Sequence, residues 1–320
     1  MLRRIIIGLL FFVAFLWVNN TSLLVHKGND KHPRLLSHRG VHQIFAGDTV
    51  RNDTCTANPV RPITHGFIEN TIPSIQAAFN AGAEVVEIDV HLTPDKVFAV
   101  FHDWTVDCRT NGTGQTNKIP FAELQTLDVG YRYSADGKTF PLRGTGIGLI
   151  PSLTDVLDTF ANGKFLINIK SNRSSEGHAL AALLESGGYE NQIFGVYGGA
   201  NPTQIVVDQI DETLGFHRTS VKDCLIRYET FGWTGIVPHA CRNQIIAVPI
   251  NYAPFLWGWP LRFQERMAAH NSKIILVGPY TGSSRIIGID TPALLNRVPE
   301  GFNGYIWTNE IDQIISWQNP

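Results

Sequence analysis

Short runs of Val, Ile, Leu and Phe alternate with helix-like stretches along most of the chain, and this alternation constrains the fold more than any other feature. The helix-like stretches include Thr71–Ala81, with Pro73 in its first turn and Gly82 at its end, Leu153–Phe160 and Gly177–Glu185. Alternation of this kind predicts a parallel sheet covered by helices. The candidate strands are Arg34–Ser37, Val85–Val90, Val97–Phe101, Phe165–Ile169, Ile193–Val196, Thr213–Phe216, Ile245–Pro249, Lys273–Val277 and Gly304–Trp307.

We predict an α/β fold of the TIM-barrel type, with a doubly wound open sheet as the competing architecture. A length of 320 residues suits one such barrel plus an export segment. There are nine candidate strands for eight places, so one is misassigned or additional, and we suspect the region Thr213–Pro249. No repeat or low-complexity linker divides the chain, and residues 29–320 are expected to form one domain.

The first residues carry the pattern of an export segment. Arg3 and Arg4 precede an apolar run, Ile5–Val18, which is shorter than the ~20 residues of a comfortable membrane span. No small-x-small cleavage site follows in Val18–Ser22. Residues 1–28 are therefore either a cleaved signal peptide or a membrane anchor. Either alternative places the protein in the periplasm, outside the cell or on the outer face of the cytoplasmic membrane.

Four cysteines fit an exported protein, because disulfides form in oxidising compartments. We expect Cys55 to pair with Cys108 and Cys224 with Cys241, although four cysteines allow three pairings. Free buried thiols are the alternative. The spacing does not match that of a structural zinc site.

The charge of the chain excludes one class of partner. With 26 basic and 28 acidic residues the formal net charge is −2, and the two signs are mixed along the chain. No global basic field exists to bind nucleic acid.

Two long connections, Val41–Ile68 and Trp104–Ile150, interrupt the alternation. Loops of this length in a compact domain are usually functional covers or small subdomains. Both should leave the carboxyl ends of strands, where barrel active sites lie. The glycines at 144–148 follow no clear strand and lack the Lys-Ser/Thr of a phosphate loop, so they are expected to form turns.

Glu87 and Asp89 are two residues apart on a predicted strand and therefore share a face. Two buried carboxylates repel each other, and a divalent cation such as Mg²⁺ or Ca²⁺ would resolve the conflict. The alternative is a polar layer neutralised by Lys170 and Arg39. For the pair alone this alternative is preferred.

His38 and His102 are expected at the ends of two nearby strands, beside that acidic pair. Histidine titrates near neutral pH and can act as a general acid or base. A lone histidine is more often a hydrogen-bonded core residue, but two at corresponding positions weaken that explanation. Arg39 and Lys170 could bind phosphate oxygens or act as structural counter-ions.

Glu69 begins the sequence Glu69-Asn70-Thr71 that precedes the first predicted helix after the export segment. Asn70 or Thr71 could be its N-cap. Glu69 could approach a metal or fix a catalytic side chain.

The order His38-Arg39-Gly40, Glu69-Asn70-Thr71, Glu87-x-Asp89 and His102-Asp103, followed by residues 110–114, resembles the glycerophosphodiester phosphodiesterase family. The match is dense from Leu35 to Gly114 and looser beyond. The resemblance implies a TIM barrel that hydrolyses small glycerophosphodiesters to sn-glycerol 3-phosphate and an alcohol. It also implies that His38 and His102 are the acid–base pair, that Glu87 and Asp89 bind a divalent cation, and that Arg39 and Lys170 hold the phosphate.

The chain departs from the family pattern in three places. Asn168 stands where the family usually has a glutamate as a third metal ligand. An amide oxygen can still bind Mg²⁺ or Ca²⁺, so we expect weaker affinity or a substitute ligand, Glu69. The first loop is longer than is typical, and Asn309 follows the last strand where the family often has an aspartate.

Two other functions remain open. A phospholipase acting on lipid head groups is one, because Phe255, Leu256, Trp257 and Trp259 form an aromatic stretch that could contact a membrane; such a stretch is more often buried. A phosphate-binding barrel with weakened catalysis is the other, suggested by Asn168.

Overall fold

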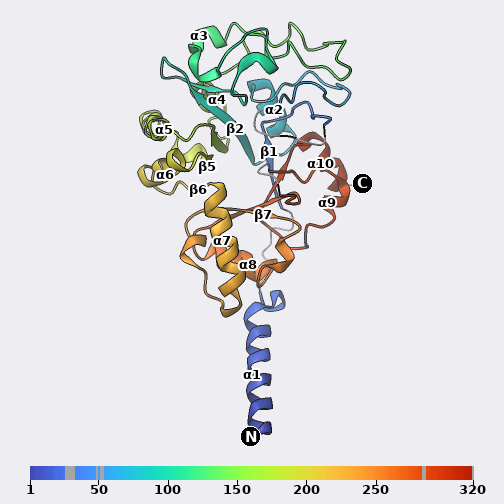
Figure 1. Ribbon diagram of the computed structural model, residues 1–320, viewed down its shortest axis with the longest axis vertical. Coiled ribbons are helices and arrows are strands. Elements are labelled where there is room, and N and C mark those ends of the chain that lie inside the picture. The colour runs from blue at the N-terminus through green and yellow to red at the C-terminus, as the bar shows by residue number, and fades with distance from the viewer. Residues whose placement is uncertain (26–32, 48–49, 51–53, 283–285, 319–320) are drawn as a thin grey trace.

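Eight parallel strands form a nearly closed barrel in this computed structural model, which describes residues 1–25, 33–47, 50, 54–282 and 286–318 (Figure 1). Hydrogen-bonded neighbours run in the order β6-β5-β4-β2-β1-β9-β8-β7, so the last strand lies beside the first. The predicted TIM barrel is confirmed and the open sheet is wrong. The barrel strands are β1 (Arg34–His38), β2 (Val85–Leu92), β4 (Phe165–Ile169), β5 (Ile193–Gly198), β6 (Gly215–Phe216), β7 (Ile245–Pro249), β8 (Lys273–Val277) and β9 (Tyr305–Thr308).

The additional strand is β3 (Phe98–Val100), and our suspicion of the region Thr213–Pro249 was wrong. Strand β2 is longer than its barrel partners, and its last residues, Val90–Leu92, pair antiparallel with β3. The chain thus turns back beside β2 instead of crossing to the next barrel position. Both β6 and β7, which flank the suspected region, are barrel strands.

Helices cover the outside of the barrel and begin at the signals visible in the sequence. The Thr71 hydroxyl accepts from Ser74 N at the start of α2, and a reciprocal capping box of Ser152 and Asp155 starts α4. The helices are α1 (Leu2–Asn20), α2 (Ile72–Asn80), α3 (Phe121–Leu124), α4 (Leu153–Thr159), α5 (Ser174–Gly187), α6 (Ala200–Gln209), α7 (Arg218–Phe231), α8 (Leu261–Ala268), α9 (Pro292–Leu295) and α10 (Ile311–Gln318). Short 3₁₀ turns are η1 (Ser22–Leu24), η2 (Val106–Cys108), η3 (Thr116–Lys118), η4 (Glu190–Gln192), η5 (Gly232–Thr234), η6 (His239–Cys241) and η7 (Ala253–Phe255).

Alternate residues of β2 face opposite sides of the barrel wall. Val86, Ile88 and Val90 belong to the buried cluster that includes helix residues, whereas Val85 belongs to the cluster that fills the barrel interior. With a side-chain period of two, Glu87 and Asp89 share the inner face with Val85. The strand that buries this apolar layer therefore also carries both carboxylates into the barrel.

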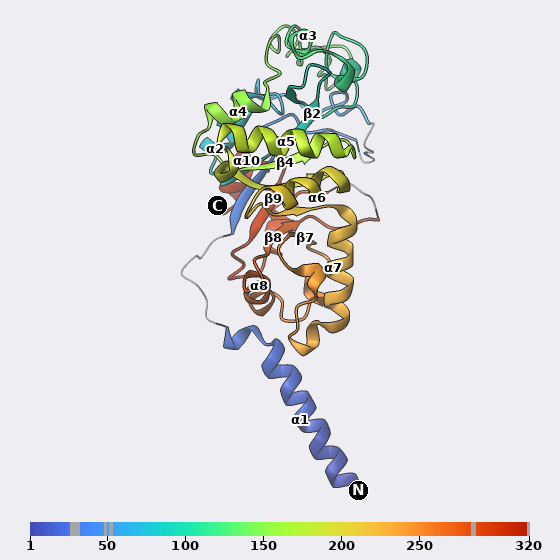
Figure 2. The same ribbon diagram turned by 90° about the vertical axis from the view of Figure 1, so that its left-hand side faces the viewer.

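The connection Trp104–Ile150 folds as a small subdomain with its own core. That core also takes in Ala57, Val60 and Ile68 from the first long connection, and the Cys55–Cys108 disulfide joins the two segments. The second disulfide is Cys224–Cys241, so both expected pairings are confirmed. The subdomain lies around α3 at one end of the molecule (Figure 2).

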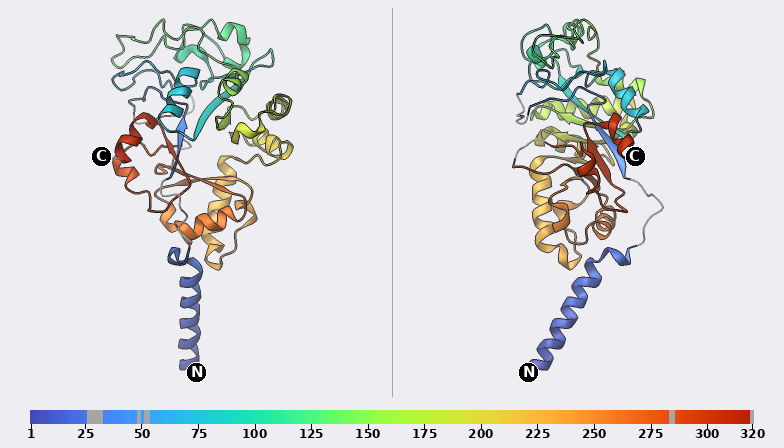
Figure 3. Two further views of the ribbon diagram at one scale, coloured as in Figure 1. Left: turned by 180° about the vertical axis from the view of Figure 1, so that it is seen from behind. Right: turned by 90° about the vertical axis from the view of Figure 1, so that its right-hand side faces the viewer.

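Helix α1 lies at the opposite end of the long axis from α3 (Figures 1 and 2). It is long and apolar enough to cross a membrane, and none of its residues is buried. Seen from behind, α7 and α8 lie between α1 and the rest of the barrel (Figure 3). The expected boundary between residues 28 and 29 falls outside the described residues.

Candidate active site

Asp89 lies on the inner face of β2, fully buried and surrounded by donors. Its Oδ1 accepts from Asn168 Nδ2 at 2.8 Å and lies 3.4 Å from Lys170 Nζ. Its Oδ2 accepts from Asn70 Nδ2 at 3.0 Å and lies 3.0 Å from Arg39 Nε. Burial would raise the pKa of Asp89, but Lys170 and Arg39 hold it well below its ordinary value. The carboxylate is therefore ionised and already neutralised by two cations.

Glu87 has a different environment from its neighbour. Its Oε1 accepts from the Tyr197 hydroxyl at 2.6 Å, whereas its buried Oε2 has no hydrogen-bond partner among the described residues. Burial and the charge of Asp89 raise the pKa of Glu87 to about 8. Glu87 consequently binds a proton near neutral pH unless another positive charge takes that place. Glu87 Oε2 lies 3.7 Å from His38 Nε2.

His38 at the end of β1 is oriented by a neutral amide. Its Nδ1 lies 2.6 Å from Asn309 Oδ1, and Asn309 Nδ2 donates to Asp290 Oδ2 at 2.6 Å. Because Asp290 receives the amide N–H, the Asn309 oxygen faces His38, and Nδ1 must be the protonated nitrogen. Burial, with Arg39 adding to it, lowers the pKa of His38 well below its ordinary value. His38 is thus a neutral imidazole with Nε2 free to accept a proton.

His102 follows β3, so it does not end a strand of the barrel as expected. Phe101 N donates to Asp89 O at 2.9 Å, and this backbone bond brings the returning chain back beside the carboxylates. His102 Nδ1 lies 2.7 Å from Asp103 Oδ1, so a carboxylate rather than an amide orients this ring. Burial, followed by Arg39 and Lys170, lowers the pKa of His102 to about 4.

Both histidines lie at the acidic pair of β2. His38 Nε2 lies 3.7 Å from Glu87 Oε2, and the bond from Phe101 N to Asp89 O holds the residue before His102 against β2. The structure brings the predicted histidines and acidic residues together at one site.

Glu69 is bound by two guanidinium groups. Its Oε1 lies 3.0 Å from Arg39 Nη1, and its Oε2 lies 2.8 Å from Arg109 Nη1. Both oxygens are occupied, and this geometry differs from the substitute metal ligand expected of Glu69. Asn70, not Glu69, reaches the acidic pair from this segment, and Thr71 is the N-cap of α2.

Asn168 faces the site with its nitrogen. The amide donates to Asp89, so the oxygen that we expected to bind a cation points away from the carboxylate. The amide would have to turn over to serve as a ligand. The third departure, Asn309, is the residue that orients His38.

Two residues of the site, Arg109 and Tyr197, were not predicted from the sequence. Arg109 is almost fully buried and bonds Asp103 through Nε at 2.7 Å, and Tyr197 bonds Glu87. For Arg109 the available signal was its position between Cys108 and the residues 110–114 that carry part of the resemblance. Tyr197 had no signal of its own: only the strand register, which aligns Asp89 with Asn168 and Asn168 with Tyr197, reveals it.

The sharp turn after β1 requires particular residues in His38-Arg39-Gly40. Arg39 and Gly40 both have positive φ, at 60° and 77°, and form a sharp turn after β1. A Cβ at Gly40 would lie 2.2 Å from Ser74 Oγ, so only glycine fits there. The turn brings Arg39 back against Asp89 while His38 stays at the end of the strand.

The described residues contain no group of three or more His, Cys, Asp or Glu side chains placed to hold a metal ion. What they offer is the Glu87–Asp89 pair, with the amide of Asn168 beside it. The buried, unpartnered Glu87 Oε2 is the position that a cation would satisfy. The donor set is of the oxygen type that Mg²⁺ and Ca²⁺ accept.

Residues 38–185 match the model of the glycerophosphoryl diester phosphodiesterase family. A glycerophosphodiester phosphodiesterase of Caldanaerobacter subterraneus is 36% identical over 102 residues, which are 32% of this chain and 39% of that protein. One of Bacillus subtilis is 27% identical over 154 residues, which are 46% of this chain and 50% of that protein. The matches thus span half or less of the length of these relatives.

Solved structures match over nearly the whole chain. The glycerophosphoryl diester phosphodiesterase domain of a Mycobacterium tuberculosis protein has a TM-score of 0.65 at 14% identity, covering 90% of this chain and 99% of that one. An Oleispira antarctica phosphodiesterase in complex with the product sn-glycerol-3-phosphate has a TM-score of 0.56 at 17% identity, covering 90% and 97%. At these identities the likeness establishes the fold.

Proposed function

The chain belongs to the glycerophosphoryl diester phosphodiesterase family through residues 38–185, and on that premise we propose that it hydrolyses glycerophosphodiesters to sn-glycerol 3-phosphate and an alcohol. One observation carries the proposal. Two imidazoles, each held through Nδ1 by a different partner, lie beside a carboxylate pair of which one member has an unpartnered oxygen. Such a site can move a proton on each side of a phosphorus atom.

In the proposed reaction, His38 accepts the proton of the attacking oxygen at Nε2. The attacker is water or a hydroxyl of the substrate's own glycerol. His102 enters the step as an imidazolium, with Nδ1–H on Asp103, and gives its Nε2 proton to the leaving oxygen; the carboxylate of Asp103 stabilises this imidazolium better than an amide would. A bound phosphodiester anion adds negative charge beside both rings and raises the pKa of each imidazole, which favours the imidazolium form of His102.

Arg39 and Lys170 are the proposed phosphate-binding residues. Both already lie at Asp89, so the positive charge is in place before substrate arrives and need not be reorganised. Glu69 then has a supporting role: it holds the Arg39 guanidinium by Nη1. This assignment replaces the metal-ligand role for Glu69.

We propose Glu87 and Asp89 as the residues that hold a divalent cation, Mg²⁺ or Ca²⁺, with Asn168 contributing its amide oxygen after turning over. A bound cation would offset charge on the phosphate oxygens. Its binding would displace the proton that Glu87 otherwise keeps near neutral pH. With an amide in place of a third carboxylate, we expect weak affinity.

The test is release of sn-glycerol 3-phosphate from glycerophosphocholine by the purified full chain, with Mg²⁺ or Ca²⁺ and with chelator. His38→Ala and His102→Ala should each lower turnover by ~10²-fold or more, the scale of a lost acid or base. His178→Ala, on the exposed face of α5, is the control and should leave turnover unchanged. Near-normal turnover in both active-site variants would reject the acid–base assignment, and activity indifferent to chelator would reject the cation.

Hydrolysis of lipid head groups is the second candidate. A human lysophospholipase D is 27% identical over 140 residues, which are 42% of this chain and 41% of that protein. In the aromatic stretch of this chain Phe255 is exposed, but Leu256 is buried and Trp259 packs against Phe263 and Phe302. Comparing lysophosphatidylcholine with glycerophosphocholine separates the two substrates. A phosphate-binding barrel without catalysis would release product from neither.

A further inference from the structure

The end of α1 is joined to the barrel by specific contacts. An apolar helix near the N-terminus is compatible with a removable signal peptide as well as with an anchor, so the helix alone decides nothing. The two alternatives differ at its carboxyl end. A leader that is discarded has no need of partners in the folded domain, whereas a retained helix can complete the domain's structure.

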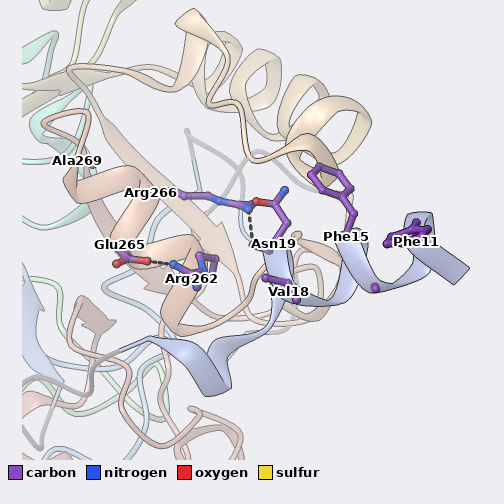
Figure 4. Close-up of a pocket in the computed structure, with 9 residues that line it drawn as sticks. Phe11, Phe15, Val18, Asn19, Arg262, Glu265, Arg266 and Ala269 are labelled. Atoms are coloured by element: carbon purple, nitrogen blue, oxygen red, sulfur yellow. Dashed lines mark hydrogen bonds and ion pairs between the residues drawn. The ribbon is translucent and has the colours of Figure 1, made fainter.

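Arg266 of α8 is a buried cation whose acceptors come partly from α1 (Figure 4). Its Nη2 donates to Asn19 O at 2.7 Å and its Nη1 to Asn20 Oδ1 at 3.1 Å. Its Nη1 also donates to Tyr228 Oη and Gly232 O, both at 2.9 Å. Within the described part of the chain, no carboxylate lies within ion-pair distance of Arg266.

The negative end of the α1 dipole is therefore what faces this charge. Carbonyl groups in the last turn of a helix lack intrahelical donors and carry partial negative charge. Arg266 supplies a donor and a positive charge at that point. Removing residues 1–20 would leave the guanidinium buried with two fewer acceptors.

Residues 19–22 make further contacts with the same flank. Asn19 and Asn20 donate through Nδ2 to Trp233 O at 2.9 and 3.0 Å. The Ser22 hydroxyl donates to Gly258 O at 3.2 Å and accepts from Leu261 N at 3.1 Å. The segment in which a signal peptide would be cleaved is thus hydrogen-bonded to the outer part of the barrel domain.

Apolar side chains beside this junction are exposed. Phe231 and Ile236 are 54% and 64% exposed, and Trp233 between them contacts Phe12 edge to face at 5.9 Å. Phe12 is eight residues before Asn20, roughly 12 Å along the helix. Trp233, in the turn η5 that follows α7, therefore reaches along α1 to a depth that lipid would occupy if α1 crossed a bilayer. We call Phe231, Trp233 and Ile236 the membrane flank.

We propose that α1 is retained as a membrane anchor and that the membrane flank is embedded beside it in the outer leaflet of a phospholipid bilayer. The 19 residues of α1 are roughly 28 Å long, and their apolar run, Ile5–Val18, is roughly 21 Å, a shortfall from the ~30 Å hydrocarbon core that local thinning of the bilayer accommodates. Arg3 and Arg4 at its start stay on the cytoplasmic side, and aromatic side chains near its other end suit the interface. This proposal does not rest on the phosphodiesterase activity.

A thiol-attached fluorophore on the full chain, reconstituted into phosphatidylcholine–phosphatidylglycerol vesicles, tests the placement. All four native cysteines are in disulfides, so an introduced cysteine is the sole free thiol. Ile236→Cys places the label on the membrane flank. Ile147→Cys is the matched control: the same residue type, 62% exposed, but in the subdomain at the far end of the molecule.

We expect spin-labelled lipid to quench the label at position 236 several-fold more than the label at position 147. Equal quenching at the two positions would overturn the placement of the membrane flank in the bilayer. The intact mass of the chain exported by its host tests retention of α1 separately. A mass that corresponds to the chain from residue 1 supports the anchor, and a mass reduced by the first ~20 residues overturns it.

Discussion

The two catalytic candidates are held through the same ring nitrogen by partners of different charge. Asn309, a neutral amide, faces His38, and Asp103, a carboxylate, faces His102. Asn309 is fixed in turn by Asp290, which accepts from its Nδ2 and from its backbone N. A positioned amide fixes the tautomer without adding charge. His38 is thereby suited to accept a proton and His102 to carry one.

Replacing Asn309 with Ala should therefore lower turnover about 10- to 100-fold with little change in KM, because His38 loses its orientation and not its contact with substrate. Asn303→Ala, at an exposed position two residues before β9, should leave turnover unchanged. Steady-state kinetics on glycerophosphocholine measure both. Equal turnover in the two variants would reject the role of Asn309 in orienting His38.

The cluster around Arg109 predicts an acid-sensitive fold. Burial would raise the pKa values of Asp103 and Glu69, but Arg109 holds both below their ordinary values. A carboxylate with a lowered folded-state pKa adds stability that is fully present above its unfolded value and is lost as the pH falls through the folded one. We expect the free energy of unfolding to decrease below about pH 5, where unfolded Asp and Glu begin to bind protons.

Urea unfolding of Asp103→Asn and of wild type at pH 7 and at acid pH checks this expectation. The variant is less stable at pH 7, since Arg109 loses a partner, and its stability falls less on acidification. Asp208→Asn, on the exposed face of α6, should follow wild type at every pH. A variant as acid-sensitive as wild type would contradict the role of Asp103.

Among single residues, those whose position follows from local spacing were predictable, and those whose contacts depend on strand register were not. The i,i+2 spacing was enough to place Glu87 and Asp89 on one face, because a strand's side-chain period is fixed. Neutralisation of the acidic pair by Arg39 and Lys170 was the predicted alternative to a metal ion, and both side chains do lie at Asp89. Tyr197 could not be foreseen, because its contact with Glu87 depends on the register of β4 and β5.

At the level of elements, the strands and the parallel direction of the barrel strands were predictable, but the antiparallel direction of β3 was not. Apolar runs identified β4, β7 and β8 with their observed limits, since buried parallel strands are nearly continuous in Val, Ile and Leu. The run at β3 looks the same in sequence but pairs antiparallel with β2. A run of apolar residues records burial, not the direction in which the chain crosses the sheet.

The two disulfides should differ in what they contribute. Cys55–Cys108 closes a separation of 53 residues and Cys224–Cys241 one of 17. Loop-closure entropy gives about 4 kcal/mol for the longer loop and about 3 kcal/mol for the shorter. Replacing both cysteines of the longer pair by Ser should therefore lower the free energy of unfolding by about 1 kcal/mol more than replacing the shorter pair. Urea midpoints of the two double variants measure the difference, and the reverse order would contradict it.

For the whole molecule, the barrel followed from alternation of strand and helix, but the docking of α1 did not. Arg266 and Asn19 are 247 residues apart, and a contact at that separation leaves no local pattern. In the sequence Arg266 resembles its neighbour Arg262 on the same short helix. In the structure Arg262 pairs with Glu265 and Arg266 caps α1.

These two arginines form a matched pair for a stability test in detergent. Arg266→Gln should lower the free energy of unfolding by about 1–3 kcal/mol, because it leaves carbonyl groups of the junction without a donor. Arg262→Gln removes a partly exposed ion pair and should cost about 1 kcal/mol or less. Thermal denaturation followed by circular dichroism compares them. A larger loss for Arg262→Gln would argue against the junction.

If α1 anchors the protein with the membrane flank toward the bilayer, as we propose, the barrel works in the layer of water next to the membrane surface. The barrel strands β1 and β2 lie on the α3 side of the molecule, away from α1 (Figure 1). Solutes shed from the bilayer would meet this catalyst before they dilute into the bulk, whereas molecules still embedded in the leaflet would lie beneath it. The amount of substrate hydrolysed would then depend on how fast substrate is released at the membrane surface. Removing α1 would change product formation in cells without changing the turnover measured with purified protein.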